Sequence, residues 1–302
     1  MRIRFDRGTL VFDQIKHGQD RSVLDGAAWD AELLAWRLPA SRLSEVRARI
    51  SDKNVRPPDI SDNIEPVALA PPIVKPELRW YQRAAIAAWR ERGKRGVIAL
   101  PTGTGKTIVA IGAILELDVA TLVLVPTRVL LDQWARALAE VWRGPIGRIG
   151  DGDYRVEAIT VTTYASAVTW APRIVDQFGL VVVDEAHHVG AWCPADVLDM
   201  MIAPARIGLT ATPPNDGGAL ERVIGPVVYT LGIAELVGDA LSEVDLETIP
   251  IHLTPDERDT YRTARGLFNL AYSRFQRHRS TWYFFHCEPP ESLYGRRGVR
   301  IL

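Results

Sequence analysis

The sequence predicts an α/β protein in which a parallel β-sheet has helices on both faces and is preceded by a small α+β domain. Through the middle of the chain, short apolar runs rich in β-branched residues alternate with helical stretches. Continuous apolar strands separated by helices are typical of a parallel sheet buried on both faces. One run leads directly into Pro101-Thr-Gly-Thr-Gly-Lys-Thr107, a glycine-rich turn before a helical stretch. The length of 302 residues fits one large or two modest domains.

Composition places the chain among ordinary globular proteins and excludes a mostly disordered one. Hydrophobic residues make up 47% and charged residues 24%, and the net charge of -1 neither demands nor excludes a nucleic acid partner. The longest apolar stretch, residues 111–126, is interrupted by Glu116 and Asp118, so we expect no membrane span. Cys193 and Cys287 give no disulfide framework, and we expect a cytoplasmic protein.

Residues 1–65 are predicted to form the small α+β domain. Two short strands alternate around Gly8 like a hairpin, a further strand follows, and Ser41 then opens a helix. The predicted strands are Arg2–Asp6, Thr9–Asp13 and Leu34–Leu38, and the predicted helix body is 42–50. Residues 66–76 carry prolines at positions 66, 71, 72 and 76, which cannot continue a helix or a sheet. We therefore predict a linker there.

Residues 77–240 are predicted to form the larger α/β domain. Its predicted strands are 96–100, 121–125, 158–161, 180–183 and 206–209, and its predicted helices are 81–91, 107–116, 129–141 and 194–201. The pattern changes in residues 241–302, where Thr254 and Pro255 mark the start of a further helix. From Arg262 onward there are eight arginines and two acids. This basic segment is either a solvated tail or a surface that contacts phosphates.

The turn after the strand 96–100 predicts a phosphate site. Gly103 and Gly105 let backbone N–H groups converge on phosphate oxygens, and the helix N-terminus adds a partial positive charge. Lys106 would reach the β- and γ-phosphates of a nucleotide, and the Thr107 hydroxyl would ligate Mg2+. The general form of such a loop has glycine where this chain has Leu100. The alternative is a glycine-rich turn that holds no ligand.

A second pattern places two acids at the end of another predicted strand. Asp184 and Glu185 follow the apolar run 180–183, and ligands of parallel sheets bind at the carboxyl ends of the strands. Asp184 would hold Mg2+ directly or through a water, and Glu185 would orient and deprotonate an attacking water. A zinc site built on His187, His188 and Cys193 lacks a fourth ligand, and we do not expect one.

Together these motifs resemble the first motor domain of superfamily-two DNA helicases of the DEAD/DEAH-box type, and the XPB-like branch in particular. The main motifs are the phosphate loop, Leu180-Val-Val-Val-Asp-Glu-Ala-His-His188 and Leu209-Thr-Ala-Thr-Pro213. Supporting ones are Leu78-Arg-Trp-Tyr-Gln82, Leu124-Val-Pro-Thr-Arg128 and Thr162-Thr-Tyr-Ala-Ser166. In the small domain, Gly8-Thr-Leu10 and Trp36-Arg-Leu-Pro-Ala40 resemble the damage-recognition-like domain of that branch.

The resemblance implies a P-loop, RecA-like domain that binds ATP and Mg2+. Catalysis would depend on Lys106, Asp184 and Glu185, and Arg79 with Gln82 would read the adenine. The residues that hold the nucleotide phosphates would be Thr102, Gly103, Thr104, Gly105, Lys106 and Thr107, and the Mg2+ ligands would be Thr107 and Asp184. The alternative for Gln82 is a solvated helix residue.

The resemblance also implies a path for DNA, either single-stranded or at a duplex junction. The DNA contacts would be Thr127, Arg128, Thr163 and Tyr164. The residues that couple this path to the nucleotide would be His187, Thr210 and Thr212, with His187 as the relay. The alternative for Arg128 is a residue that only covers the surface, and the alternative for Tyr164 is a side chain buried by packing. For Thr210 and Thr212, the alternative is hydroxyls that only complete the hydrogen bonds of a strand end.

Two features depart from the pattern. Pro214-Asn-Asp-Gly217 stands where the branch usually has an Arg-Glu-Asp element. The chain ends at Leu302, before any second RecA-like domain that would bring an arginine finger. We therefore expect the N-terminal half of an XPB-like helicase or translocase, connected with DNA repair and weak as an ATPase by itself. The alternatives are a catalytically weak nucleotide- and DNA-binding partner of a second protein, and the motor part of a restriction system that works with a nuclease.

Overall fold

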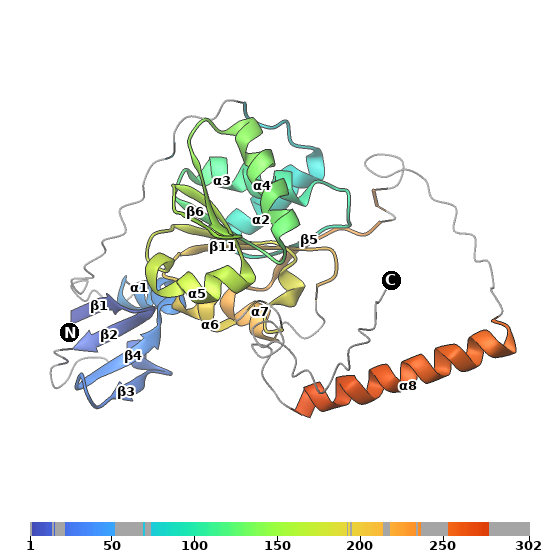
Figure 1. Ribbon diagram of the computed structural model, residues 1–302. Helices are drawn as coiled ribbons and strands as arrows, with labels where there is room; N and C mark the ends of the chain where they lie inside the picture. The colour runs from blue at the N-terminus through green and yellow to red at the C-terminus, as the bar shows by residue number, and fades with distance from the viewer. Residues whose placement is uncertain are drawn as a thin grey trace. The chain divides into compact units, whose positions relative to one another are not determined.

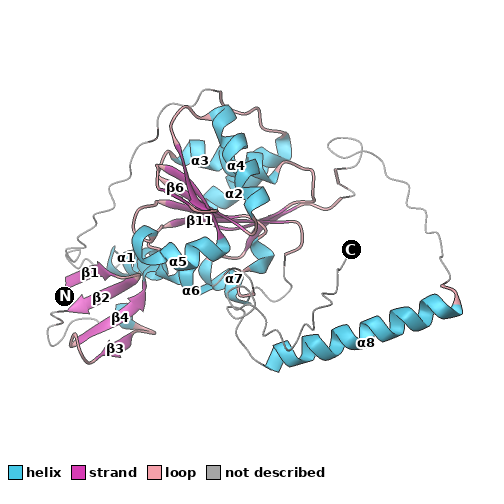
Figure 2. Cartoon of the chain, viewed as in Figure 1, coloured by secondary structure: helices cyan, strands magenta, loops and turns pink. Residues whose placement is uncertain are grey.

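The computed structural model describes residues 2–13, 15, 22–51, 69, 74–191, 193, 195–213, 218–233, 235–236 and 253–277. The chain divides into two compact units, Met1–Ser242 and Glu243–Leu302. The first unit holds two β-sheets, a small antiparallel one and a large one with helices on both faces (Figures 1 and 2). None of the helices in the described ranges is long and apolar enough to cross a membrane.

The small sheet has the strand order β1-β2-β4-β3 and is antiparallel throughout. Its strands are β1 (Arg2–Asp6), β2 (Thr9–Asp13), β3 (Ala28–Asp30) and β4 (Ala35–Pro39). Helix α1 (Leu43–Ser51) packs Leu43 and Val46 against a core that includes Ile3, Leu10 and Phe12. The predicted hairpin is confirmed, and the predicted third strand and helix are each displaced by one residue. The prediction missed β3, which has three residues and too little pattern to recognise.

The large sheet has the strand order β12-β5-β11-β10-β6-β9-β7-β8. Every neighbouring pair in it is parallel except β7 with β8. The strands are β5 (Arg95–Ala99), β6 (Thr121–Val125), β7 (Ile146–Gly150), β8 (Asp153–Arg155), β9 (Ile159–Thr163), β10 (Leu180–Val183), β11 (Ala205–Thr210) and β12 (Val227–Thr230). The predicted parallel sheet is confirmed.

Alternate residues of the strands belong to two separate cores, one on each face of this sheet. Val123 and Val125 pack with α2 (Trp80–Glu91), α3 (Lys106–Leu117) and α4 (Arg128–Val141). Leu122 and Leu124 pack on the other face with α5 (Tyr164–Ile174), α6 (Ala195–Met200) and α7 (Gly218–Val223). Figure 1 shows α2, α3 and α4 on one side of the sheet and α5, α6 and α7 on the other. Because both faces are covered, the central strands β6 and β10 are apolar at almost every position.

The sequence prediction missed the β7–β8 hairpin, β12, α5 and α7. Two glycines interrupt β7, and α5 contains Pro172 and directly follows the threonine-rich β9, so neither carries a clear period. Of the predicted linker, only residues 69 and 74–76 belong to the described ranges. Most of the predicted linker, and the part of the predicted basic segment after residue 277, therefore lie outside them.

The small sheet is held against the large one near the amino ends of β5 and β11. The Ser41 hydroxyl donates to Asp199 Oδ1 (3.0 Å), and Arg95 Nη1 donates to the Ser41 carbonyl (3.1 Å). Gly8 packs so closely on Met200 that a Cβ at this glycine would lie 2.5 Å from the Met200 side chain. A side chain at position 8 would therefore push the small sheet away from α6.

Arg206 on β11 is fully buried and its guanidinium is bound by backbone carbonyls. It donates to the carbonyls of Ala203, Leu198, Val223 and Met201 at 2.5–3.2 Å. Burial lowers the pKa of this side chain to about 9, so it remains protonated at neutral pH. The charge is accommodated because its N–H groups complete the ends of α6, α7 and the loop between α6 and β11.

The second unit contains α8 (Pro255–Arg277). Thr254 accepts the backbone N–H of Glu257 on its hydroxyl (3.3 Å), and the Glu257 carboxylate accepts the Thr254 N–H (2.8 Å). This reciprocal pair is a capping box, and it confirms the predicted helix start.

We predict that Arg206→Met lowers the free energy of unfolding by at least about 3 kcal/mol in urea titrations. The substitution fills much of the volume but leaves several buried carbonyls without donors, each at a cost of about 1–3 kcal/mol. The control is Arg90→Ala, which breaks an exposed ion pair with Glu116 and should cost about 0–1 kcal/mol. An equal decrease in the free energy of unfolding in the two variants would show that the buried hydrogen bonds of Arg206 do not stabilise the protein more than an exposed ion pair does.

Candidate nucleotide and DNA site

The functional candidates gather at one edge of the large sheet because the strands that carry them are parallel. The phosphate loop follows β5, Thr127 follows β6, Asp184 follows β10, and Thr212 follows β11. Thr163 is the last residue of β9. All of these positions are at carboxyl ends of strands, where open α/β sheets bind their ligands.

The phosphate loop is held in its bent shape by its own hydrogen bonds. Gly103 and Gly105 have φ angles of 84° and 78°, a left-handed conformation that side chains disfavour. The Thr104 hydroxyl donates to the Pro101 carbonyl (2.7 Å). Lys106 Nζ donates to the carbonyls of Leu100 and Pro101 at 3.2 and 3.3 Å. The ammonium group therefore lies within the loop, where a phosphate would replace neutral carbonyls with a charged acceptor.

Helix α2 is fixed to the phosphate loop by two buried side chains. Gln82 Nε2 and the Tyr81 hydroxyl both donate to the Thr104 carbonyl, at 3.0 and 2.9 Å. Gln82 Oε1 accepts the backbone N–H of Arg79 (2.9 Å). Gln82 is 4% exposed, so the alternative of a solvated helix residue is wrong. Contact of Arg79 and Gln82 with adenine stays a prediction.

Asp184 is buried, and both of its carboxylate oxygens accept N–H groups. Oδ2 accepts the indole N–H of Trp134 on α4 (2.7 Å), and Oδ1 accepts the backbone N–H of Glu185 (3.0 Å). Burial raises the pKa of the Asp184 carboxyl above its ordinary value, while the Trp134 bond and the charge of Lys106 act in the opposite direction. The sequence prediction did not include Trp134, because a tryptophan at helical spacing looks like ordinary core.

Glu185 turns the chain sharply away from β10. Its φ of 50° and ψ of 49° are left-handed, and a short 3-10 turn, Ala186–His188, follows. The Tyr164 hydroxyl donates to the Asp184 carbonyl beneath this turn. Tyr164 is 3% exposed and burial raises the pKa of its hydroxyl, so it remains a protonated donor. This burial favours the alternative of a tyrosine buried by packing, and contact of Tyr164 with DNA stays a prediction.

His187 connects the acids to the end of β11. Its Nδ1 lies 3.0 Å from the Thr210 hydroxyl and 3.4 Å from Glu185 Oε2. The Thr210 hydroxyl also accepts the backbone N–H of Thr212 (3.1 Å). The three predicted coupling residues are therefore in one chain of contacts that reaches Glu185. The same hydroxyl of Thr210 also completes the strand end, so the two interpretations are compatible.

The remaining predicted DNA residues lie at the starts of α4 and α5. Thr127 and Thr163 are N-caps, and their hydroxyls accept the backbone N–H groups of Leu130 and Ser166. Arg128 is exposed and pairs with Asp151 in the β7–β8 turn at 2.5 Å. Arg128 is thus the predicted DNA contact that offers a charged, accessible group.

The residues at this edge fit a magnesium nucleotide. Oxygen donors from Asp184 and Thr107 are of the type that Mg2+ prefers. Glycine at position 105 lets α2 pack closely on the loop, since a Cβ there would lie 2.7 Å from Gln82 Nε2. The N-terminus of α3 follows the loop and favours an anion.

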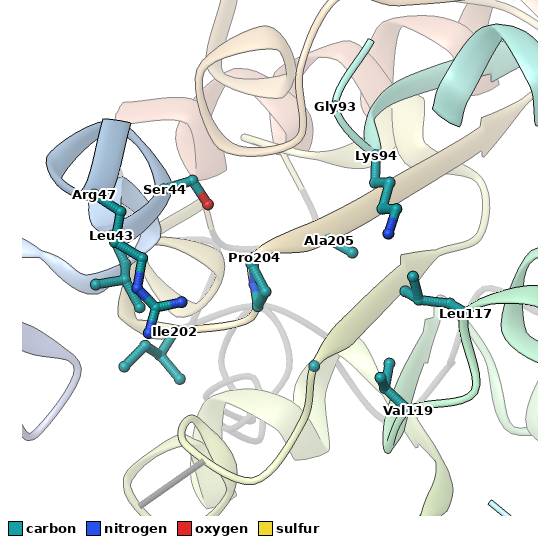
Figure 3. Close-up of a pocket in the computed structure, with 11 residues that line it drawn as sticks. Leu43, Ser44, Arg47, Gly93, Lys94, Leu117, Val119, Ile202, Pro204 and Ala205 are labelled. Atoms are coloured by element: carbon teal, nitrogen blue, oxygen red, sulfur yellow. The ribbon is translucent and has the colours of Figure 1, made fainter. Parts of the chain in front are cut away.

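A separate cavity of about 380 Å³ lies at the opposite edge of the large sheet (Figure 3). Leu43 and Ser44 of α1 line one side of it, and Lys94 and Ala205 line the other. Because it opens at the amino ends of the strands, it is distinct from the site that holds Lys106 and Asp184.

Comparison with known proteins agrees with this geometry. A family model described as the Xeroderma pigmentosum group B helicase damage recognition domain matches residues 3–59. A second model, described as the Type III restriction enzyme, res subunit, matches residues 75–215. The DNA 3'-5' translocase XPB2 of Sulfurisphaera tokodaii is 35% identical over 264 residues, which are 86% of this chain and 57% of that protein. Over most of its length, the chain is therefore similar to XPB-like helicases.

Other relatives cover less of the XPB-like chain. The DNA 3'-5' helicase XPB of Mycobacterium tuberculosis is 30% identical over 207 residues, which are 62% of this chain and 37% of that protein. Among solved structures, the Pyrococcus furiosus Hef helicase domain is 26% identical, with a TM-score of 0.43 over 50% of this chain and 37% of that chain. The XPB-like chain thus spans between about a third and three fifths of the length of these proteins.

We predict that Gly105→Ala in the XPB-like chain weakens nucleotide binding at least about tenfold. An alanine at this φ costs about 1–2 kcal/mol, and its Cβ would push Gln82 away from the loop. The loop then loses at least one charge-assisted contact with phosphate. Binding is measured with a fluorescent ATP analogue.

The matched control is Gly93→Ala. Gly93 has a φ of 73°, but a Cβ there meets nothing within 4 Å. This variant should lose similar stability and keep its nucleotide affinity. Equal affinity in Gly105→Ala and wild type would contradict the placement of the phosphates.

Proposed function

We propose that this chain is the ATP-binding part of an XPB-like DNA helicase or translocase, in which Mg2+-dependent ATP hydrolysis is coupled to contact with DNA. The observation that supports it best is the chain of contacts from Glu185 through His187 to Thr210, next to the phosphate loop. A role in DNA repair, a DEAH-type box and a cytoplasmic location belong to the same proposal.

Each residue at the nucleotide edge has a distinct task in this proposal. Lys106 exchanges its loop carbonyls for the β- and γ-phosphates, and the backbone of residues 102–107 surrounds them. Asp184 and Thr107 hold Mg2+, which neutralises charge that develops on the phosphates. Glu185, whose side chain is about a third exposed, orients a water and takes its proton.

DNA contact is proposed for the neighbouring strand ends. Arg128 is exposed at the start of α4, where the helix N-terminus adds a partial positive charge that favours a phosphate. Thr127 and Thr163 would contribute mainly by fixing the starts of α4 and α5. The second RecA-like domain that the family resemblance implies would supply an arginine finger, and it is a proposed partner.

Two other functions compete with this one. A catalytically weak binding partner of a second protein would make the same nucleotide and DNA contacts. It would differ from a helicase in its low rate of ATP hydrolysis. The motor part of a restriction system is suggested by the description of the model that matches residues 75–215. The match of residues 3–59 to a helicase damage recognition domain favours the XPB-like function instead.

We expect Lys106→Ala to lower the affinity for Mg2+-ATP about tenfold or more. The substitution removes a charge-assisted contact worth about 1.5–3 kcal/mol. The control is Lys94→Ala, which removes an exposed lysine at the other edge of the sheet and should change nothing. Glu185→Gln separates binding from chemistry, because it should keep nucleotide affinity and lose hydrolysis. If Lys106→Ala binds as well as wild type, the proposed nucleotide site is incorrect.

Opposite effects on DNA binding are expected from the two partners of the Arg128–Asp151 pair. Arg128→Ala should weaken binding and reduce the slope of log affinity against log salt by about 0.7–0.9, since one phosphate contact is lost. Asp151→Asn should strengthen binding, because it frees Arg128 and removes a negative charge. Fluorescence anisotropy with a labelled oligonucleotide at several salt concentrations measures both. Unchanged slopes in the two variants would place the DNA elsewhere.

A further inference from the structure

Trp134 makes a polar contact from an otherwise apolar helix face. On α4 it lies among Leu131, Leu138 and Val141, which recur at helical spacing and are buried. Trp134 itself is 1% exposed, and its indole N–H donates to Asp184 Oδ2 at 2.7 Å. Packing alone would be satisfied by any large apolar side chain. The direction of this N–H toward a carboxylate indicates a further role.

The two N–H groups on Asp184 fix the carboxylate in two directions. Trp134 binds Oδ2 from α4, and the Glu185 backbone binds Oδ1 from the turn after β10. Each carboxylate oxygen accepts more than one bond, so each keeps a free acceptor direction for a cation or its water. The remaining directions are set by the two donors, because a buried carboxylate cannot rotate without breaking both bonds.

We propose that Trp134 is a positioning residue that sets the affinity of the nucleotide site for Mg2+. This inference rests on the proposed function, since it takes Asp184 as the Mg2+ ligand. Groups that hydrogen-bond to a metal ligand orient it, and their loss typically costs 10–100-fold in metal affinity. The inference applies to Mg2+ and leaves the affinity for nucleotide without Mg2+ unchanged, because the described hydrogen bond of Trp134 goes to Asp184 and not to the phosphate loop.

Trp89 provides a matched control in the same chain. It is buried on α2 at 2% exposure, and its indole N–H donates to the Arg206 carbonyl at 2.8 Å. That carbonyl lies near the start of β11, away from Asp184. Trp134→Phe and Trp89→Phe therefore remove the same group from comparable surroundings, and only the first removes it from Asp184.

The experiment uses the full chain and a fluorescent ATP analogue. Nucleotide affinity is measured in EDTA and then across a Mg2+ titration, and the Mg2+ concentration at half-maximal enhancement is the main readout. We expect this midpoint to rise about 10–100-fold in Trp134→Phe and to stay unchanged in Trp89→Phe. Affinity in EDTA should be equal in all three proteins. Thermal unfolding of each variant reports any general loss of structure.

A second measurement on the wild-type chain covers the case in which Trp134→Phe does not fold. The indole N–H resonances are followed by NMR through the same Mg2+ titration with nucleotide bound. The Trp134 signal should shift with the midpoint of Mg2+ binding, whereas the Trp89 signal, identified from Trp89→Phe, should not.

The possible outcomes separate this inference from the function on which it rests. A wild-type chain that binds no nucleotide at any Mg2+ concentration overturns both. Normal Mg2+-dependent binding in wild type, with the same midpoint in a folded Trp134→Phe, overturns the role of Trp134 alone. A Trp134 indole resonance that does not shift during the Mg2+ titration likewise overturns the role of Trp134 alone. A raised midpoint with equal affinity in EDTA supports it.

Discussion

The parallel pairing of β5, β11, β10 and β6 is the constraint on which the candidate site depends. The pairing sets Ala99 opposite Thr210 and Leu124 opposite Val183, so the loop after each strand begins at the same level. The Leu100 N–H then bonds to the Thr210 carbonyl (3.0 Å), and the Asp184 N–H bonds to the Leu124 carbonyl (2.9 Å). This register brings together residues that are far apart in the sequence. A shift or reversal of one strand would move its motif away from the others.

The site combines a rigid frame with a few available groups. Thr104, Gln82 and Tyr81 use their polar atoms within the protein, which fixes the phosphate loop before a ligand arrives. Lys106 instead binds neutral carbonyls that a phosphate can replace at a gain. Because the loop is already ordered in the folded protein, ligand binding does not lose the conformational entropy of ordering it.

The sequence was sufficient for features that depend on local pattern and insufficient for those that depend on long-range contacts. The apolar strands, the glycine-rich turn and the Asp184–Glu185 pair are continuous in the chain and were predicted. The bond between Trp134 and Asp184 joins residues 50 positions apart, and tryptophan at that position has a sufficient explanation as core. Tyr164 shows the reverse case. It lies within the motif Thr162-Thr-Tyr-Ala-Ser166, which suggested a surface role, but as the first residue of α5 it is buried and bonded to the Asp184 carbonyl.

Helix α4 connects the predicted DNA side of the site with the Asp184 carboxylate. Its first residue, Arg128, carries the exposed charge at the predicted DNA side, and Trp134, about 9 Å further along the helix axis, contacts Asp184. Leu131, Leu138 and Val141 are buried along the helix and hold it on the sheet. The predicted DNA contact and the indole that bonds to the Asp184 carboxylate therefore belong to one packed helix. The contact through His187 and Thr210 approaches the same acids from β11, so the two sides of the site are joined through both neighbours of β10.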